Sequence, residues 1–150
     1  MNIFKWFKQS KFDRAINFLI EVNEENRDNF EHLCKQIPLV DYLLFACMVH
    51  CSCGRAVGKT HYVVTHATNK DLIVCHNRSI IELYRQKYNG NERLNIISVD
   101  QIDSSVLRGR NFEKVYVDEP ALCFKNYDRI KFYEMLLQQP TEPTIIMLGE

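Results

Sequence analysis

Short apolar runs alternate with longer amphipathic stretches through most of the chain, and this alternation is what most constrains the fold. The apolar runs are bounded by polar residues or proline, and they lie at 47–51, 71–76, 94–99, 114–120 and 143–150. Patterns typical of helices separate them, at 58–69, 77–88 and 127–139. Strands that alternate with helices form a parallel sheet whose two faces are covered. We therefore expect an α/β fold, a three-layer sandwich with a mainly parallel sheet.

The residues before this alternation form a helical segment of their own. Apolar residues at helical spacing mark one face of an expected helix, with charges opposite: Phe12, Ile16, Leu19 and Ile20. A second helix should end near Phe45, just before the first strand. The sequence thus predicts an N-terminal helical extension over 1–37 and a core over 38–150. Because the last strand runs to the end of the chain, we expect either a fragment or a minimal domain.

Two further segments carry local predictions. Asn77 is an expected N-cap of the helix over 77–88. One side of that helix should carry its apolar and aromatic residues: Ile80, Ile81, Tyr84 and Tyr88. The segment 100–113 is expected to be a polar connection.

Composition and charge exclude several classes of protein. The 150 residues are 46% hydrophobic and 25% charged, as in an ordinary soluble domain, and the formal net charge is zero. There is no global basic field for nucleic acid, although a local patch remains open. No apolar run reaches the roughly 18 residues of a membrane span. The amphipathic segment 1–17 lacks the long apolar core of a signal peptide, so we expect an intracellular protein that is neither secreted nor membrane-bound.

The chain contains six cysteines, and several lie inside apolar runs such as 43–49 and 72–76. Free cysteine behaves there as a small apolar residue, which favours a reducing compartment without structural disulfides. A metal site is the alternative, and its ligands would be His50, Cys51, Cys53 and His61. Cys-x-Cys is not the spacing of a zinc finger, and no second pair follows at the required distance.

The segment 50–64 contains the end of a phosphate-binding loop. In the pattern G-x-x-x-x-G-K-[ST], Cys53 holds the position of the first glycine. Backbone N–H groups of the loop and of the following helix would face phosphate, and Gly58 would let the backbone approach closely. Lys59 would place its charge between the β- and γ-phosphates, and the Thr60 hydroxyl would bind Mg²⁺. The predicted nucleotide-binding residues of the loop are Cys53, Gly54, Arg55, Ala56, Val57, Gly58, Lys59 and Thr60.

The strand over 114–120 is the second chemical feature. It brings Asp118 and Glu119 to its carboxyl end, the edge of an open α/β sheet at which ligands bind. Asp118 is placed to hold Mg²⁺ through water. Glu119 is placed to orient or deprotonate an attacking water, from which hydrolysis benefits, whereas a site that only binds needs the first carboxylate alone.

Together these residues resemble the Walker A and Walker B motifs of the additional-strand P-loop ATPases (RecA/ASCE-like). The displaced glycine is similar to one branch, the large terminase subunits that package viral DNA. Their loop commonly carries an arginine four residues before the lysine, as Arg55 stands before Lys59. The segment 107–120 is also similar to the stretch that leads into the acidic motif of terminases and related helicase-like ATPases. The resemblance covers about residues 36–149.

The resemblance implies an ATPase that uses ATP and Mg²⁺ and powers viral DNA packaging or translocation in the host cytoplasm. DNA, further copies of the chain or other motor subunits would be its partners. It implies that Arg55 senses the γ-phosphate or triggers hydrolysis, beside Lys59 and Glu119 as catalytic residues, and that Gln36 reads adenine. Arg108 and Arg110 would contact DNA or a neighbour's nucleotide, or would simply be solvated loop residues.

The sequence departs from the family in ways that keep other functions open. The coupling motif expected after the last strand, the acidic cluster of a nuclease and a second motor domain are all missing from these residues. The alternatives are the ATPase domain of a helicase-like protein and a nucleotide-binding regulatory module with little turnover. The pair Asp118–Glu119 argues against the regulatory module. A kinase lid rich in arginine and the guanine motif of GTPases are not found.

Overall fold

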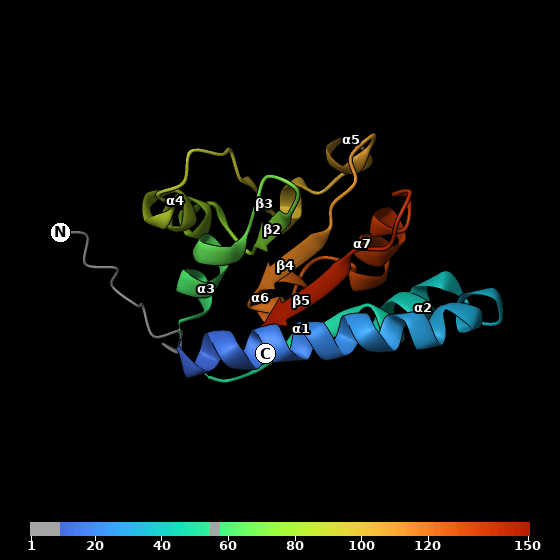
Figure 1. Ribbon diagram of the computed structural model, residues 1–150. Helices are drawn as coiled ribbons and strands as arrows, with labels where there is room; N and C mark the ends of the chain where they lie inside the picture. The colour runs from blue at the N-terminus through green and yellow to red at the C-terminus, as the bar shows by residue number, and fades with distance from the viewer. Residues whose placement is uncertain (1–9, 55–57) are drawn as a thin grey trace.

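The computed structural model describes residues 10–54 and 58–150, and in these residues a parallel sheet forms the centre of the protein (Figure 1). Its five strands are β1 (Met48–Cys51), β2 (Leu72–Cys75), β3 (Asn95–Ser98), β4 (Lys114–Asp118) and β5 (Thr144–Leu148). Their spatial order is β1-β5-β4-β2-β3, and every pair is parallel. The predicted strands and the mainly parallel sheet are therefore confirmed.

The strand order places β5, the last strand in sequence, between β1 and β4. Val115 of β4 lies opposite Ile145 of β5 on one side and Leu72 of β2 on the other. All residues of β2 and β5 are buried, which explains their continuous apolar runs, because helices cover both of their faces. This order brings the carboxyl ends of β1, β5 and β4 side by side.

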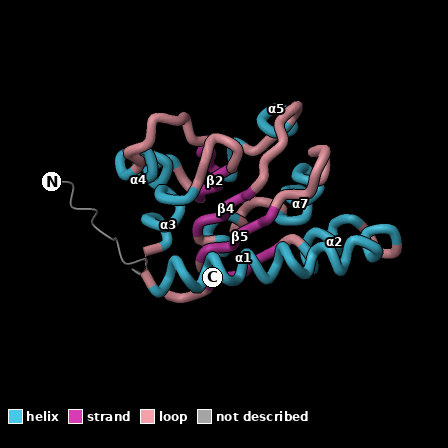
Figure 2. Tube along the Cα trace, in the orientation of Figure 1, coloured by secondary structure: helices cyan, strands magenta, loops and turns pink. Residues whose placement is uncertain are grey.

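Helices cover the sheet on both faces and give three layers (Figure 2). The described helices are α1 (Lys11–Phe30), η1 (Glu31–Lys35), α2 (Leu39–Ala46), α3 (Lys59–His66), α4 (Arg78–Lys87), η2 (Val99–Gln101), α5 (Ser104–Leu107), α6 (Pro120–Cys123) and α7 (Arg129–Leu136). Helices α1, α3 and α4 share one apolar core with the sheet, whereas α2, α5, α6 and α7 share the other. The α/β class and its layers follow the prediction.

The N-terminal helix α1 packs against the sheet. Phe12, Ile16 and Ile20 are buried in the core that α3 and α4 also line, as predicted. The expectation for Leu19 was wrong, because this side chain is exposed. Phe12, Ile16 and Ile20 follow one another at intervals of four residues, and Leu19 lies at the edge of that stripe. The division of the chain after residue 37 stays a prediction.

The segment 100–113 is more structured than the predicted polar connection. It contains part of η2 and the whole of α5, and Ile102, Leu107 and Phe112 are buried in it. The backbone N–H of Phe112 donates to the side-chain oxygen of the buried Gln139 at 2.6 Å. Three apolar residues at irregular spacing give no periodic signal, so sequence reasoning missed this part of the core.

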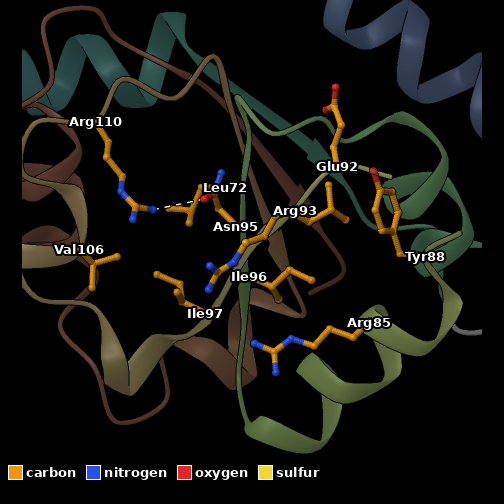
Figure 3. Close-up of a pocket in the computed structure, with 11 residues that line it drawn as sticks. Leu72, Arg85, Tyr88, Glu92, Arg93, Asn95, Ile96, Ile97, Val106 and Arg110 are labelled. Atoms are coloured by element: carbon orange, nitrogen blue, oxygen red, sulfur yellow. Dashed lines mark hydrogen bonds between the residues drawn. The ribbon is translucent and has the colours of Figure 1, made fainter. Parts of the chain in front are cut away.

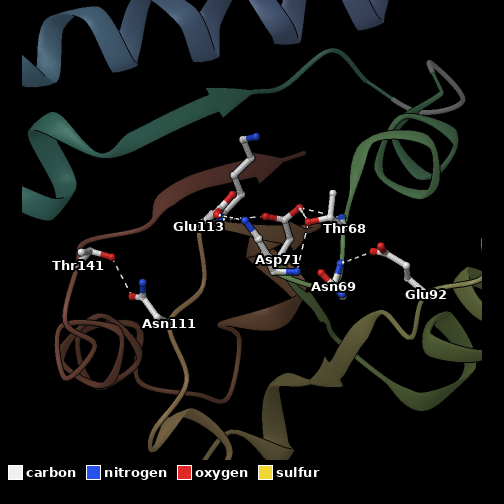
Figure 4. A network of polar contacts seen from close by, with 9 residues as sticks. Thr68, Asn69, Asp71, Glu92, Asn111, Glu113 and Thr141 are labelled. Carbon is white, nitrogen blue, oxygen red and sulfur yellow. Dashed lines mark hydrogen bonds and ion pairs between the residues drawn. The ribbon is translucent and has the colours of Figure 1, made fainter.

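A buried carboxylate holds together the amino ends of the strands (Figure 4). Asp71, which precedes β2, accepts hydrogen bonds from the N–H and the hydroxyl of Thr68 at 2.8 and 3.1 Å. It also accepts from the N–H of Lys114 in β4 at 3.1 Å, and its backbone C=O accepts from the Asn95 side chain in β3. One residue therefore links β2, β3 and β4 at this edge.

Candidate active site

The opposite, carboxyl edge of the sheet carries a small pocket of about 150 Å³. Its lining comes from the ends of β1, β4 and β5 and from the start of α3, and consists of Ser52, Gly54, Lys59, Glu119, Gly149 and Glu150. These residues are distant in sequence, but parallel strands bring their carboxyl ends to one edge. The structure thus unites the two predicted motifs.

Lys59 and Glu119 are in direct contact in this pocket although 60 residues separate them. The Lys59 ammonium forms an ion pair with Oε1 of Glu119, and the two side chains are 10% and 33% exposed. Lys59 is the first residue of α3, and Glu119 follows the last residue of β4. Partial burial shields this pair from solvent, so the charges interact more strongly than at an open surface.

Gly58 caps α3 with a left-handed backbone, φ 99°. Its carbonyl accepts the first hydrogen bond of the helix from Tyr62 at 2.8 Å. A Cβ on Gly58 would meet no atom within 4 Å, and the same holds for Gly54, whose φ is 76°. The left-handed backbone by itself therefore favours glycine at both positions, and the close approach of Gly58 to phosphate stays a prediction.

Glu119 is the only described residue other than glycine with a positive φ, 53°. Its N–H donates to the carbonyl of Leu148 at 2.9 Å, which joins the end of β4 to the end of β5. A Cβ on Gly149 would collide with the Glu119 carboxylate, and the φ of 120° at this position would strain any other residue. Such a backbone costs on the order of 1–3 kcal/mol and is typical of functional sites.

Asp118 ends β4 with a side chain that is almost fully buried. Burial raises the pKa of its carboxyl group, and the nearby Glu119 raises it further. The Tyr84 hydroxyl, Lys59 and His76 act in the opposite direction. Asp118 therefore lies beside the Lys59–Glu119 pair in surroundings that disfavour its charge.

Tyr84 and His76 are polar residues of this region that sequence reasoning missed as site residues. Tyr84 is fully buried, and its hydroxyl lies near Asp118 and Thr60 without making a hydrogen bond of normal geometry. Burial also raises the pKa of the Tyr84 hydroxyl. The Nδ1 atom of His76, directly after β2, is buried without a partner among the described residues. The one signal in the sequence was a tyrosine on the core side of α4.

Some predicted site residues lie elsewhere. Gln36 is exposed between η1 and α2, at the far end of α2 from β1, and it is not among the residues that line the pocket. Arg108 and Arg110 are exposed after α5, and Arg110 donates to the Asn95 side chain at 3.2 Å, at the β3 edge. The predicted loop residues 55–57, which include Arg55, Ala56 and Val57, lie outside the described residues.

Cys53, in the position of the first glycine, is exposed after β1. Its Sγ lies 3.3 Å from Sγ of the buried Cys51. Burial first, and then the contact with Cys53, raise the pKa of the Cys51 thiol to about 12. The five cysteines whose side chains are described are free, as expected.

The predicted Mg²⁺ ligands are Thr60 and Asp118, and the Tyr84 hydroxyl lies near both of them. Mg²⁺ prefers one or two protein oxygens together with phosphate and water, and this pair fits that preference. No group of three or more His, Cys, Asp or Glu side chains suited to a metal occurs within 10–54 and 58–150.

Over the same residues, no helix has the length and apolar character needed to cross a bilayer.

No protein-family model matches the chain, and the search of curated proteins finds no significant match.

Proposed function

We propose that this chain binds Mg²⁺-ATP at the carboxyl edge of its sheet and hydrolyses it, as the ATPase domain of a terminase-like motor. The observation that supports the proposal is the contact between Lys59 and Glu119 in a pocket beside Asp118. The position of β5 between β1 and β4 fits an additional-strand ATPase. The same chemistry would serve a helicase-like ATPase, and DNA as the substrate of the motor is part of the proposal.

The residues divide the binding of phosphate between them. Lys59 supplies a positive charge, and the first N–H groups of the eight-residue helix α3 point toward the same place. Thr60 and Asp118 hold Mg²⁺, which neutralises phosphate charge when bound. A pocket of about 150 Å³ is smaller than the roughly 300–1,000 Å³ of sites that enclose a whole ligand. It therefore takes phosphate groups, while the ribose and base lie outside it.

Glu119 activates the water. In the described state its carboxylate is paired with Lys59. When Lys59 turns to the phosphates, the carboxylate becomes free to accept a proton from a water molecule. The hydroxide oxygen then forms a bond to the γ-phosphorus as the bond to the ADP oxygen breaks. The left-handed backbone of Glu119 directs its side chain into the pocket, and Gly149 leaves room there for the carboxylate.

Calorimetric titration with Mg²⁺-ATP tests the site through Lys59→Ala. Loss of the ammonium leaves the phosphates without a charge partner, so we expect binding to weaken by roughly 2–5 kcal/mol. Lys70→Ala is the matched control, since Lys70 also pairs with a glutamate, Glu113 at 2.9 Å, but at the exposed amino edge. Equal affinities of Lys59→Ala and wild type would refute the phosphate site.

A further inference from the structure

A cavity of about 600 Å³ lies away from the active site, along the outer edge of β3 (Figure 3). Strand β3 pairs with β2 alone, so its other edge is free of strands in the described sheet. Helix α4 forms one wall of the cavity and the connection from α5 to β4 forms another. We call this cavity the arginine groove, after three of its lining residues: Arg85, Arg93 and Arg110.

The arginine groove combines apolar lining with charge, and its three arginines outnumber one lining carboxylate, Glu92. Figure 3 shows the guanidinium groups extending from the surrounding segments into the groove, beside Ile97 and Val106. Arg85 forms an exposed ion pair with Glu82, and Arg93 has no hydrogen bond or ion pair within the described residues. A groove of this kind fits an apolar side chain that is flanked by carboxylates.

The outer face of α1 presents that combination. Phe18 is 62% exposed, and Glu21, Glu25 and Asp28 follow it on the same side of the helix. Intervals of three, seven and ten residues from Phe18 place all four within one helical face. No ion pair involves these carboxylates in the part of the chain that the structure describes. We call these four residues the acidic face of α1.

The two surfaces lie at opposite edges of the sheet. Helix α1 packs against β1, which is one edge strand, and the arginine groove follows β3, which is the other. They therefore do not meet within one molecule. Two complementary surfaces that are separated in this way can pair only between copies of the chain.

We propose that the acidic face of α1 of one copy docks in the arginine groove of the next copy. Phe18 contacts the apolar lining, and Glu21, Glu25 and Asp28 pair with the guanidinium groups, as in a helix bound in a groove. The contact joins two different patches, so it is head-to-tail and builds closed rings or open chains according to its rotation. The formal net charge of the chain is zero, so copies do not repel one another as a whole. The carboxylates of α1 on one copy attract the arginines of the groove on the next.

Sedimentation velocity over a range of concentrations tests the contact with two charge reversals. The groove variant is Arg85→Glu with Arg93→Glu, and the helix variant is Glu21→Arg with Glu25→Arg. Each alone sets like charges against each other, so we expect self-association to weaken at least about 10-fold. Mixing the two variants pairs the reversed surfaces with complementary ones and should restore association. Wild-type association should also weaken when salt rises from about 50 to about 500 mM.

The controls reverse charges on α7, which covers the other face of the sheet, through Lys131→Glu and Glu134→Arg; these should associate as wild type does. A wild type that stays monomeric at about 100 µM would overturn the proposal. So would charge-reversed variants that associate normally, or a mixture of the two variants that fails to associate.

ATP affinity is measured on the same samples. The two surfaces lie outside the Lys59 pocket, so loss of ATP binding by Lys59→Ala and loss of association by the charge reversals are separate outcomes.

Discussion

The two ends of the sheet each bury an aspartate, and the aspartates are held very differently. Asp71 at the amino edge is 3% exposed and accepts three hydrogen bonds. Asp118 at the carboxyl edge is 7% exposed, and its side-chain carboxylate receives no hydrogen bond of normal geometry from the described residues. Each end also has a Lys–Glu pair, exposed at the amino edge and partly buried at the carboxyl edge.

The number of hydrogen bonds that each carboxylate accepts indicates its role. Asp71 stabilises the fold, whereas Asp118 is available to a ligand. Buried acceptors with all their donors in place hold strands together, as Asp71 does. A buried carboxylate with few donors costs stability, and such a residue is typical of a site that binds something else. The carboxyl edge also contains the strained Glu119, whereas the described residues of the amino edge have no strained residue of this kind.

The largest effect is expected for Glu119→Gln at the carboxyl edge. Glu119→Gln removes the proposed base, so we expect turnover of ATP to fall by a factor on the order of 10²–10⁴ while binding is kept. Glu113→Gln at the amino edge is the control and should leave turnover unchanged. Steady-state phosphate release measures both. Normal turnover in Glu119→Gln would show that another residue is the base. The glutamates at the two edges would then not differ in function.

A second prediction concerns stability at the amino edge. Asp71→Asn turns one acceptor into an N–H₂ group that faces the donors of Thr68 or Lys114, and it leaves buried N–H groups unpaired. We expect a loss of about 2–4 kcal/mol in the free energy of unfolding, measured by urea titration. Little change would mean that the hydrogen bonds around Asp71 do not hold the strands.

The same substitution at the other edge should act in the opposite direction. Burial raises the pKa of Asp118, so its carboxyl group binds protons more readily in the folded state than in the unfolded one. Its contribution to stability is present at low pH and is lost as the pH rises through the folded pKa. Asp118→Asn should therefore stabilise the protein at neutral pH by on the order of 1 kcal/mol, or about 2–4 °C in Tm.

This gain should shrink as the pH falls toward the range in which the carboxyl group is protonated. Thermal unfolding of both proteins across that range measures it. A destabilised Asp118→Asn protein at neutral pH would show that Asp118 is held as firmly as Asp71.

The smallest effect is expected for Tyr84→Phe, which removes only the hydroxyl near Asp118 and Thr60. Without that hydroxyl, Asp118 should be less well oriented, and the Mg²⁺ concentration for half-maximal ATPase activity should rise a few-fold. Tyr133→Phe is the control, because Tyr133 is equally buried but lies in the other core. If both variants respond alike to Mg²⁺, Tyr84 serves packing alone.

Much of the site followed from local pattern. Short apolar runs between helical stretches predicted the strands, and the rule for parallel sheets placed Lys59 and Glu119 at one edge. The cap Asn77 was also predicted, and its side chain accepts from Ile80 at 3.0 Å. These features depend on neighbours in the chain, so periodicity and spacing are enough to reveal them.

Contacts between distant segments were decided only by the tertiary structure. The place of β5 between β1 and β4, the burial of Tyr84 near Asp118 and the distance of Gln36 from the pocket all depend on how whole elements pack. The acidic face of α1 and the arginine groove are likewise far apart only because β1 and β3 are the two edges of the sheet. Sequence by itself determined which residues carry charge and which are apolar, because these are properties of single side chains. Their neighbours in space follow from strand order, which the hydrophobic pattern of separate segments does not encode.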